Sequence, residues 1–158
     1  MKENMNGFLK LRGNPVQVDL FTEYKEEKDG DWKPVEKSKV RPFLHPLTGD
    51  ELHEVEAVAV EAYRLFAEKG ASDRDATWKS ARVEKCQLVY LTLKRNKEKE
   101  SPRLFEDEAE VVTLHFGEVD RIFDLYWKTF RPTKDEIKNC LRERLGDGSK
   151  TESTSPRD

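Results

Sequence analysis

Side chains that commonly carry catalysis are sparse in this chain. Its imidazoles are His45, His53 and His115, and its two cysteines, Cys86 and Cys140, lie far apart. Neither a CxxC pair nor a Cys/His spacing typical of a zinc site or a disulfide framework occurs. Because Cys86 falls on an apolar helical pattern, we expect a buried structural thiol rather than a reactive one. This cysteine usage favours a reducing, cytoplasmic location.

Metal and nucleotide sites have little support either. Asp50, His53 and Glu54 form the one group that suggests a metal site, but Ala57 stands where an HExxH motif needs its second histidine. Carboxylates at this place are explained more simply by a helix start. The eight glycines are dispersed without GxGxxG or P-loop spacing. We therefore predict no metal and no cofactor.

An enzyme without these motifs would have to rely on carboxylates. Asp120 and Asp124 are the candidates for such a site. Exposed positions on a helix face are the simpler interpretation of both residues. We predict a protein that is not an enzyme.

Aromatic residues give the candidates for partner binding. Trp127 falls beside the apolar stripe of an expected helix, which contains Ile122, Phe123, Tyr126 and Phe130. Its side chain either covers the rim of the core or anchors a partner, because exposed Trp and Tyr often dominate protein interfaces. The exposed sides of this helix and of the one expected at 52–66 are the candidate contact surfaces, with these partner-binding residues: Trp127, Tyr126, Phe130 and Tyr63.

The elements that position these residues begin with strands. Apolar and polar residues alternate over 15–24, and the turn pair Asp29-Gly30 separates this segment from a second strand segment at 32–44. Pro34 and Pro42 cannot donate ladder hydrogen bonds, so the second strand should be an edge or be interrupted. The segment 8–11 is a possible third short strand.

A helical pair should follow. Thr48 and Glu51 have capping-box spacing, apolar residues then recur at helical spacing to Phe66, and Gly70 supplies a stop. Ser72 can cap a second helix that runs to about Arg95. Its expected apolar positions are Trp78, Ala81, Cys86, Val89 and Leu93. The short connection predicts antiparallel neighbours.

Further helices are expected beyond a charged loop at 96–102. Acidic residues at 106–108 suit the start of a short helix that Gly117 ends or kinks. A helix at 119–130 is closed by Pro132, and a last one, opened by a second capping-box pattern at 133–136, reaches Leu145. The tail at 147–158 is expected to be disordered.

Composition bounds the class of protein. The chain has 158 residues with 29 Lys or Arg and 32 Asp or Glu, for a net charge of −3. This balance opposes binding to nucleic acid or to anionic membranes, and no apolar run approaches the roughly 20 residues that span a bilayer. A helix-turn-helix around Gly70 is disfavoured because Asp73 and Asp75 would face phosphates. We predict one α+β domain at 1–146, with an N-terminal antiparallel hairpin or small sheet (strands at about 8–44) and a bundle of about four helices (about 49–145).

The order of the motifs resembles that of a known family. A charged hairpin leads into RPFLHPLTGDEL at 41–52, two helices follow, and SPRLFEDEAEV at 101–111 precedes a helix that reaches Tyr126. This arrangement, over about 35–126, resembles the small tail assembly chaperones of long-tailed bacteriophages.

The resemblance implies a function. Such a chaperone is made in the host cytoplasm, binds the long helical tape-measure protein, and keeps it soluble until tail-tube subunits polymerise around it. Family members are often extended by a translational frameshift, and the added domain is thought to recruit tube protein; a homo-oligomer is also possible. The alternative is a virion component such as a tail-terminator or head–tail connector subunit, which the strand-rich start favours.

Overall fold

The computed structural model describes residues 13–130, 138 and 142. The chain divides into two compact units, Asn14–Thr129 and the two chain ends, Met1–Gly13 with Phe130–Asp158. Three predictions lie outside the described residues: the strand at 8–11, most of the last helix, and the tail at 147–158.

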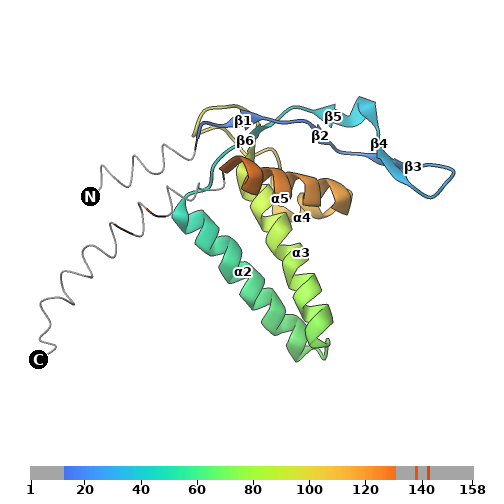
Figure 1. Ribbon diagram of the computed structural model, residues 1–158, viewed down its shortest axis with the longest axis vertical. Coiled ribbons are helices and arrows are strands. Elements are labelled where there is room, and N and C mark those ends of the chain that lie inside the picture. The colour runs from blue at the N-terminus through green and yellow to red at the C-terminus, as the bar shows by residue number, and fades with distance from the viewer. Residues whose placement is uncertain (1–12, 131–137, 139–141, 143–158) are drawn as a thin grey trace, which may run out of the picture. The chain divides into compact units, whose positions relative to one another are not determined.

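The N-terminal part is an interrupted antiparallel ribbon, as the alternating pattern predicts (Figure 1). Its two arms pair as β1 with β6, β2 with β5, and β3 with β4. Gly30 has a φ of +84° in the connecting turn, a conformation that glycine adopts at little steric cost. The strands are Val16–Gln17 (β1), Leu20–Phe21 (β2), Tyr24–Glu26 (β3), Trp32–Pro34 (β4), Lys39–Val40 (β5) and Phe43–Leu44 (β6).

Interruptions in the second arm follow its prolines. A 3-10 turn, Glu36–Ser38 (η1), separates β4 from β5, and Pro42 separates β5 from β6. Each proline lacks the N–H that a continuous ladder needs. The prediction of an interrupted second strand is confirmed.

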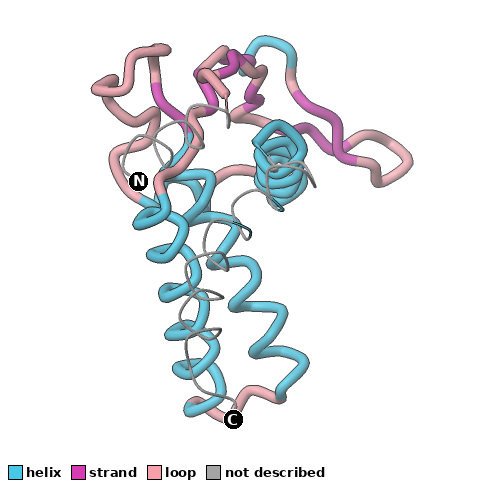
Figure 2. The backbone as a smooth tube through the Cα atoms, turned by 60° about the vertical axis from the view of Figure 1, so that its left-hand side comes forward, coloured by secondary structure: helices cyan, strands magenta, loops and turns pink. Residues whose placement is uncertain are grey.

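A helical hairpin follows, formed by α2 (Gly49–Glu68) and α3 (Asp73–Thr92), which run side by side (Figure 2). The capping box is present: the Glu51 N–H donates to the Thr48 Oγ1, and the Thr48 N–H donates to the Glu51 carboxylate, both at 3.1 Å. Ser72 accepts the Asp75 N–H at 3.1 Å. Both predicted helix starts are confirmed.

The end of α3 differs from the prediction. The helix stops at Thr92 rather than near Arg95, because Leu93–Lys94 forms strand β7 and pairs with β6. Leu93 and Lys94 continue the helical spacing of the sequence, but pairing with the edge of β6 makes them a strand. The resulting three-stranded sheet has the order β1-β6-β7.

Two further helices complete the described residues, giving the predicted α+β fold. The short helix α4 (Glu108–Val112) is capped by Asp107, whose carboxylate accepts the Glu110 N–H at 3.1 Å. The longer helix α5 (Phe116–Phe130) includes Gly117 in its first turn. The expectation that Gly117 would end or kink a helix is wrong, since His115 caps α5 by accepting the Gly117 N–H at its Nδ1 (3.1 Å).

The core consists of apolar residues from the C-terminal half of α3, the strands, α4 and α5. Leu88 and Val89 of α3 have no exposed surface, and Cys86 is buried as predicted. Other fully buried apolar residues are Leu20, Leu44, Leu93, Val111, Val119 and Ile122. In contrast, α2 buries Val55 alone among its described residues.

Candidate functional site

The sequence-predicted aromatic residues of α5 have different environments. Tyr126 is buried, and its hydroxyl accepts the Leu47 N–H at 3.0 Å, so it ties α5 to the segment before α2. Trp127 is 37 % exposed and packs edge-on against Tyr126, with ring centroids 5.2 Å apart. Phe130 is also buried. Trp127 is thus the most accessible of the three, and their contact with a partner stays a prediction.

Tyr63 is not gathered with these residues. It lies in the C-terminal half of α2, and its hydroxyl donates to the Asp73 carboxylate at the start of α3. This bond couples the two helices across their connection, raising the pKa of the Tyr63 hydroxyl. The candidate residues therefore do not form one site.

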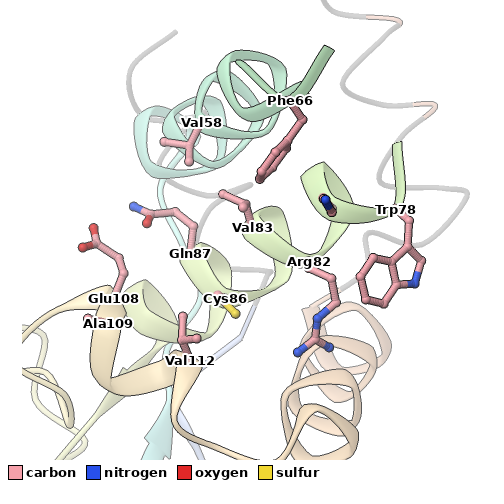
Figure 3. Close-up of a pocket in the computed structure, with 11 residues that line it drawn as sticks. Val58, Phe66, Trp78, Arg82, Val83, Cys86, Gln87, Glu108, Ala109 and Val112 are labelled. Atoms are coloured by element: carbon pink, nitrogen blue, oxygen red, sulfur yellow. The ribbon is translucent and has the colours of Figure 1, made fainter. Parts of the chain in front are cut away.

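A different site lies where α2, α3 and α4 meet. An open groove of about 530 Å³ lies at this junction, and Figure 3 shows the side chains that line it. Val58 and Phe66 come from α2, Val83 from α3, and Ala109 and Val112 from α4. Its remaining lining residues are Trp78, Lys79, Arg82, Cys86, Gln87 and Glu108. Most of its surface is apolar.

Large apolar side chains at this groove remain in water. Trp78 is 65 % exposed and Val112 is 66 % exposed. Trp78 was expected on the buried stripe of its helix, and this expectation is wrong. Three of its four neighbours one helical turn away are charged: Arg74, Asp75 and Arg82. These charged neighbours are a sequence signal of a solvent-facing position.

Charges are unevenly placed around the groove. Lys79 lies over the Phe66 ring, with Nζ 5.4 Å from its centroid. Arg82 and Lys85 both form ion pairs with the Asp120 carboxylate. Arg82 Nη1 lies 3.7 Å from Asp120 Oδ1, and Lys85 Nζ lies 3.1 Å from the same oxygen. Glu108 lines the groove from the first turn of α4. The cations Lys79 and Arg82 thus line the α3 side of the groove, and the carboxylate Glu108 lines its α4 side.

Two titratable groups near the groove are constrained by their surroundings. Burial raises the pKa of the Cys86 thiol, so the thiol is less reactive than an exposed cysteine at neutral pH. Asp120, a carboxylate considered for catalysis, is held by Arg82 and Lys85. Away from the groove, in the segment between β6 and α2, burial lowers the pKa of His45, and its Nε2 lies 2.7 Å from the Asn96 carbonyl oxygen.

In the part of the chain that the structure describes, no group of three or more His, Cys, Asp or Glu side chains could hold a metal ion, so Asp50, His53 and Glu54 do not form such a cluster. Across residues 13–130, none of the helices is long and apolar enough to cross a bilayer.

Comparisons with protein-family models, with curated proteins and with solved structures each found no match for this chain.

Proposed function

We propose that the protein binds an amphipathic helix of a partner protein in the groove between α2, α3 and α4. The observation that carries this proposal is the exposure of Trp78 and Val112 at the rim of an apolar groove. An amphipathic helix that docks in such a groove removes this apolar surface from water. Tryptophan anchors of this kind often supply much of the binding energy.

The partner we propose is the tape-measure protein of a long-tailed phage. The motif order at 41–52 and 101–111 supports this assignment, because it resembles that of the tail assembly chaperones. A long helical client exposes apolar faces until tube protein surrounds it. A chaperone that covers those faces needs an apolar groove inside a charged, soluble surface, and this chain has 39 % charged residues. The activity is binding rather than catalysis, in the cytoplasm of the host cell.

Co-expression with the tape-measure protein encoded beside this gene tests the proposal. The wild-type chain should raise the soluble yield of that protein. The double variant Trp78→Ser/Val112→Ser should lose this effect, because both changes make the groove polar. Val60→Ser is the matched control, since Val60 is 70 % exposed on α2 and does not line the groove. An unchanged client yield with the wild-type chain would contradict the proposal.

Mass spectrometry of purified virions separates this function from the alternative. A chaperone should be missing from mature particles. A tail-terminator or connector subunit should be present in a small fixed copy number, and that result would replace the chaperone proposal.

A further inference from the structure

A row of aromatic rings lies beside the groove. His115 stacks on Tyr24 with centroids 4.4 Å apart, on Phe116 at 4.8 Å, and contacts Trp32 at 5.5 Å. Trp32 is 50 % exposed and Phe116 is 58 % exposed. We call these four residues the aromatic row. It joins the β3–β4 arm of the ribbon to the start of α5.

Hydrogen bonds hold two rings of the row, those of Tyr24 and His115, in place. The Tyr24 hydroxyl donates to the Glu118 carboxylate at 2.5 Å, and Glu118 is fully buried. Arg121 also donates to Glu118, from Nε at 3.0 Å. His115 is fixed by the N–H of Gly117 at its Nδ1. A surface whose rings are already ordered loses little conformational entropy when a partner covers it.

Arg82 connects the aromatic row to the groove. Its guanidinium lies over the Phe116 ring, 5.3 Å from the centroid, and the same side chain lines the groove. Asp120 lies closer to Lys85, at 3.1 Å, than to Arg82, at 3.7 Å. A cation that shares its carboxylate with a nearer lysine is available to an acidic group of a partner.

We propose that the groove and the aromatic row are two halves of one binding surface, joined at Arg82, which takes a helix carrying acidic residues between two apolar clusters. This inference rests on the proposed function and adds the sequence pattern of the partner. The first apolar cluster enters the groove, the acidic residues lie at Lys79 and Arg82, and the second apolar cluster covers Trp32 and Phe116.

Charge complementarity argues for this occupant. Lys79, Arg82 and Lys85 stand on successive turns of α3, and Asp120 is the carboxylate paired with the last two. A partner with basic residues at the same place would be repelled. Like-charge contacts at an interface are a common source of specificity.

Binding of three synthetic peptides to the full chain tests the inference. The first is a helical peptide of about 25 residues. Seven residues at each end carry an apolar helix face, and glutamates occupy the segment between them. The second has lysines in place of these glutamates, and the third is a shorter peptide with one apolar heptad and the glutamates. Affinities are measured by fluorescence anisotropy of labelled peptides.

The wild-type chain should bind the glutamate peptide about tenfold more tightly than the lysine peptide. Arg82→Gln should remove most of this preference, whereas Arg64→Gln, on α2 outside the surface, should retain it. Trp32→Ala should lower the affinity for the long glutamate peptide about tenfold and leave the affinity for the short peptide unchanged. Val60→Ala is the matched apolar control, because Val60 is exposed on α2 and belongs to neither the groove nor the aromatic row, and it should change neither affinity.

Equal affinity for the two long peptides, or no effect of Trp32→Ala, would overturn the inference. If the short peptide still binds and Trp78→Ala weakens it, groove binding and the proposed function survive that result. If the short peptide does not bind, the groove fails as a helix site and the inference fails with it. Tighter binding of a single-stranded oligonucleotide than of any peptide would also overturn it.

Discussion

The two halves of α3 have the same helical backbone and opposite environments. In the C-terminal half, every residue from Cys86 to Thr92 except Tyr90 is buried. In the N-terminal half, Ala76 is the buried residue among those described, and Trp78 stands in water. Figure 1 shows this half beside α2, away from the ribbon.

This difference separates residues that hold the fold from residues available to a partner. A fully buried side chain contributes its transfer free energy to stability, whereas an exposed one contributes little. Keeping Trp78 and Val112 exposed does not help the isolated chain. Under the proposed function, a partner helix buries both residues. Substitutions in the C-terminal half of α3 should therefore change stability, and substitutions in its N-terminal half should change partner binding.

The largest effect should come from Leu88→Ala. Leu88 is fully buried, so this truncation should lower the free energy of unfolding by about 2–5 kcal/mol. Trp78→Ala on the same helix should change it by less than about 0.5 kcal/mol. Urea unfolding followed by circular dichroism measures both values. Similar losses of unfolding free energy in the two variants would contradict the difference between the two halves of α3.

Glu118→Gln should have the next largest effect. The substitution removes the carboxylate that pairs with Arg121 and accepts from Tyr24, and we expect a cost of about 1–3 kcal/mol because the site is buried. Asp124→Asn is the control, since Asp124 is exposed on the same helix. Equal stabilities of the two variants in urea would show that the network beneath the aromatic row contributes nothing.

Gly117→Ala should destabilise the chain by about 1 kcal/mol, although alanine is usually the better helix former. A Cβ at this position would lie 3.0 Å from Nδ1 of His115. His115 is stacked against Tyr24 and Phe116, which limits its movement. Thermal unfolding measures the change, and a raised midpoint would show that the aromatic row is adaptable rather than fixed.

The smallest effect should be the pH dependence that Tyr24 contributes. Burial, with the Glu118 carboxylate as its hydrogen-bond partner, raises the pKa of Tyr24 from 10.0 to about 12. The folded state therefore holds this proton more tightly, so the contribution is complete below pH 10 and is lost as pH rises toward 12. Water reaches part of this ring, which keeps the effect small.

Comparing the wild-type chain with Tyr24→Phe isolates that contribution from the other groups that titrate at high pH. The stability difference between them should shrink from pH 9 to pH 12 if the pKa is raised to about 12. A constant difference would contradict the assigned hydrogen bond.

Local signals predicted the fold better than the candidate site. The caps at Thr48 and Ser72, the Asp29-Gly30 turn and the proline interruptions each depend on a few neighbouring residues, and all are present. The end of α3 depends on β6, a strand far away in sequence, which competes for Leu93 and Lys94. The helical spacing of apolar residues carries no information about pairing with a strand far away in sequence.

The groove was missed for a similar reason. Apolar spacing placed Trp78 on the buried stripe, but its exposure depends on which elements reach the N-terminal half of α3. Tyr126 shows the converse case, because it was a candidate contact residue and is buried with its hydroxyl on the Leu47 N–H. Tertiary packing decides which apolar residues of an amphipathic helix remain exposed.

Fluorescence of Trp78 tests the central claim most directly. The variant Trp32→Phe/Trp127→Phe leaves Trp78 as the one tryptophan of the three in the sequence. When this variant binds the co-expressed tape-measure protein, or a fragment of it without tryptophan, the emission of Trp78 should shift to shorter wavelength and its quenching by acrylamide should fall. If a complex forms while Trp78 stays as exposed as in the free chain, the groove is not the binding site.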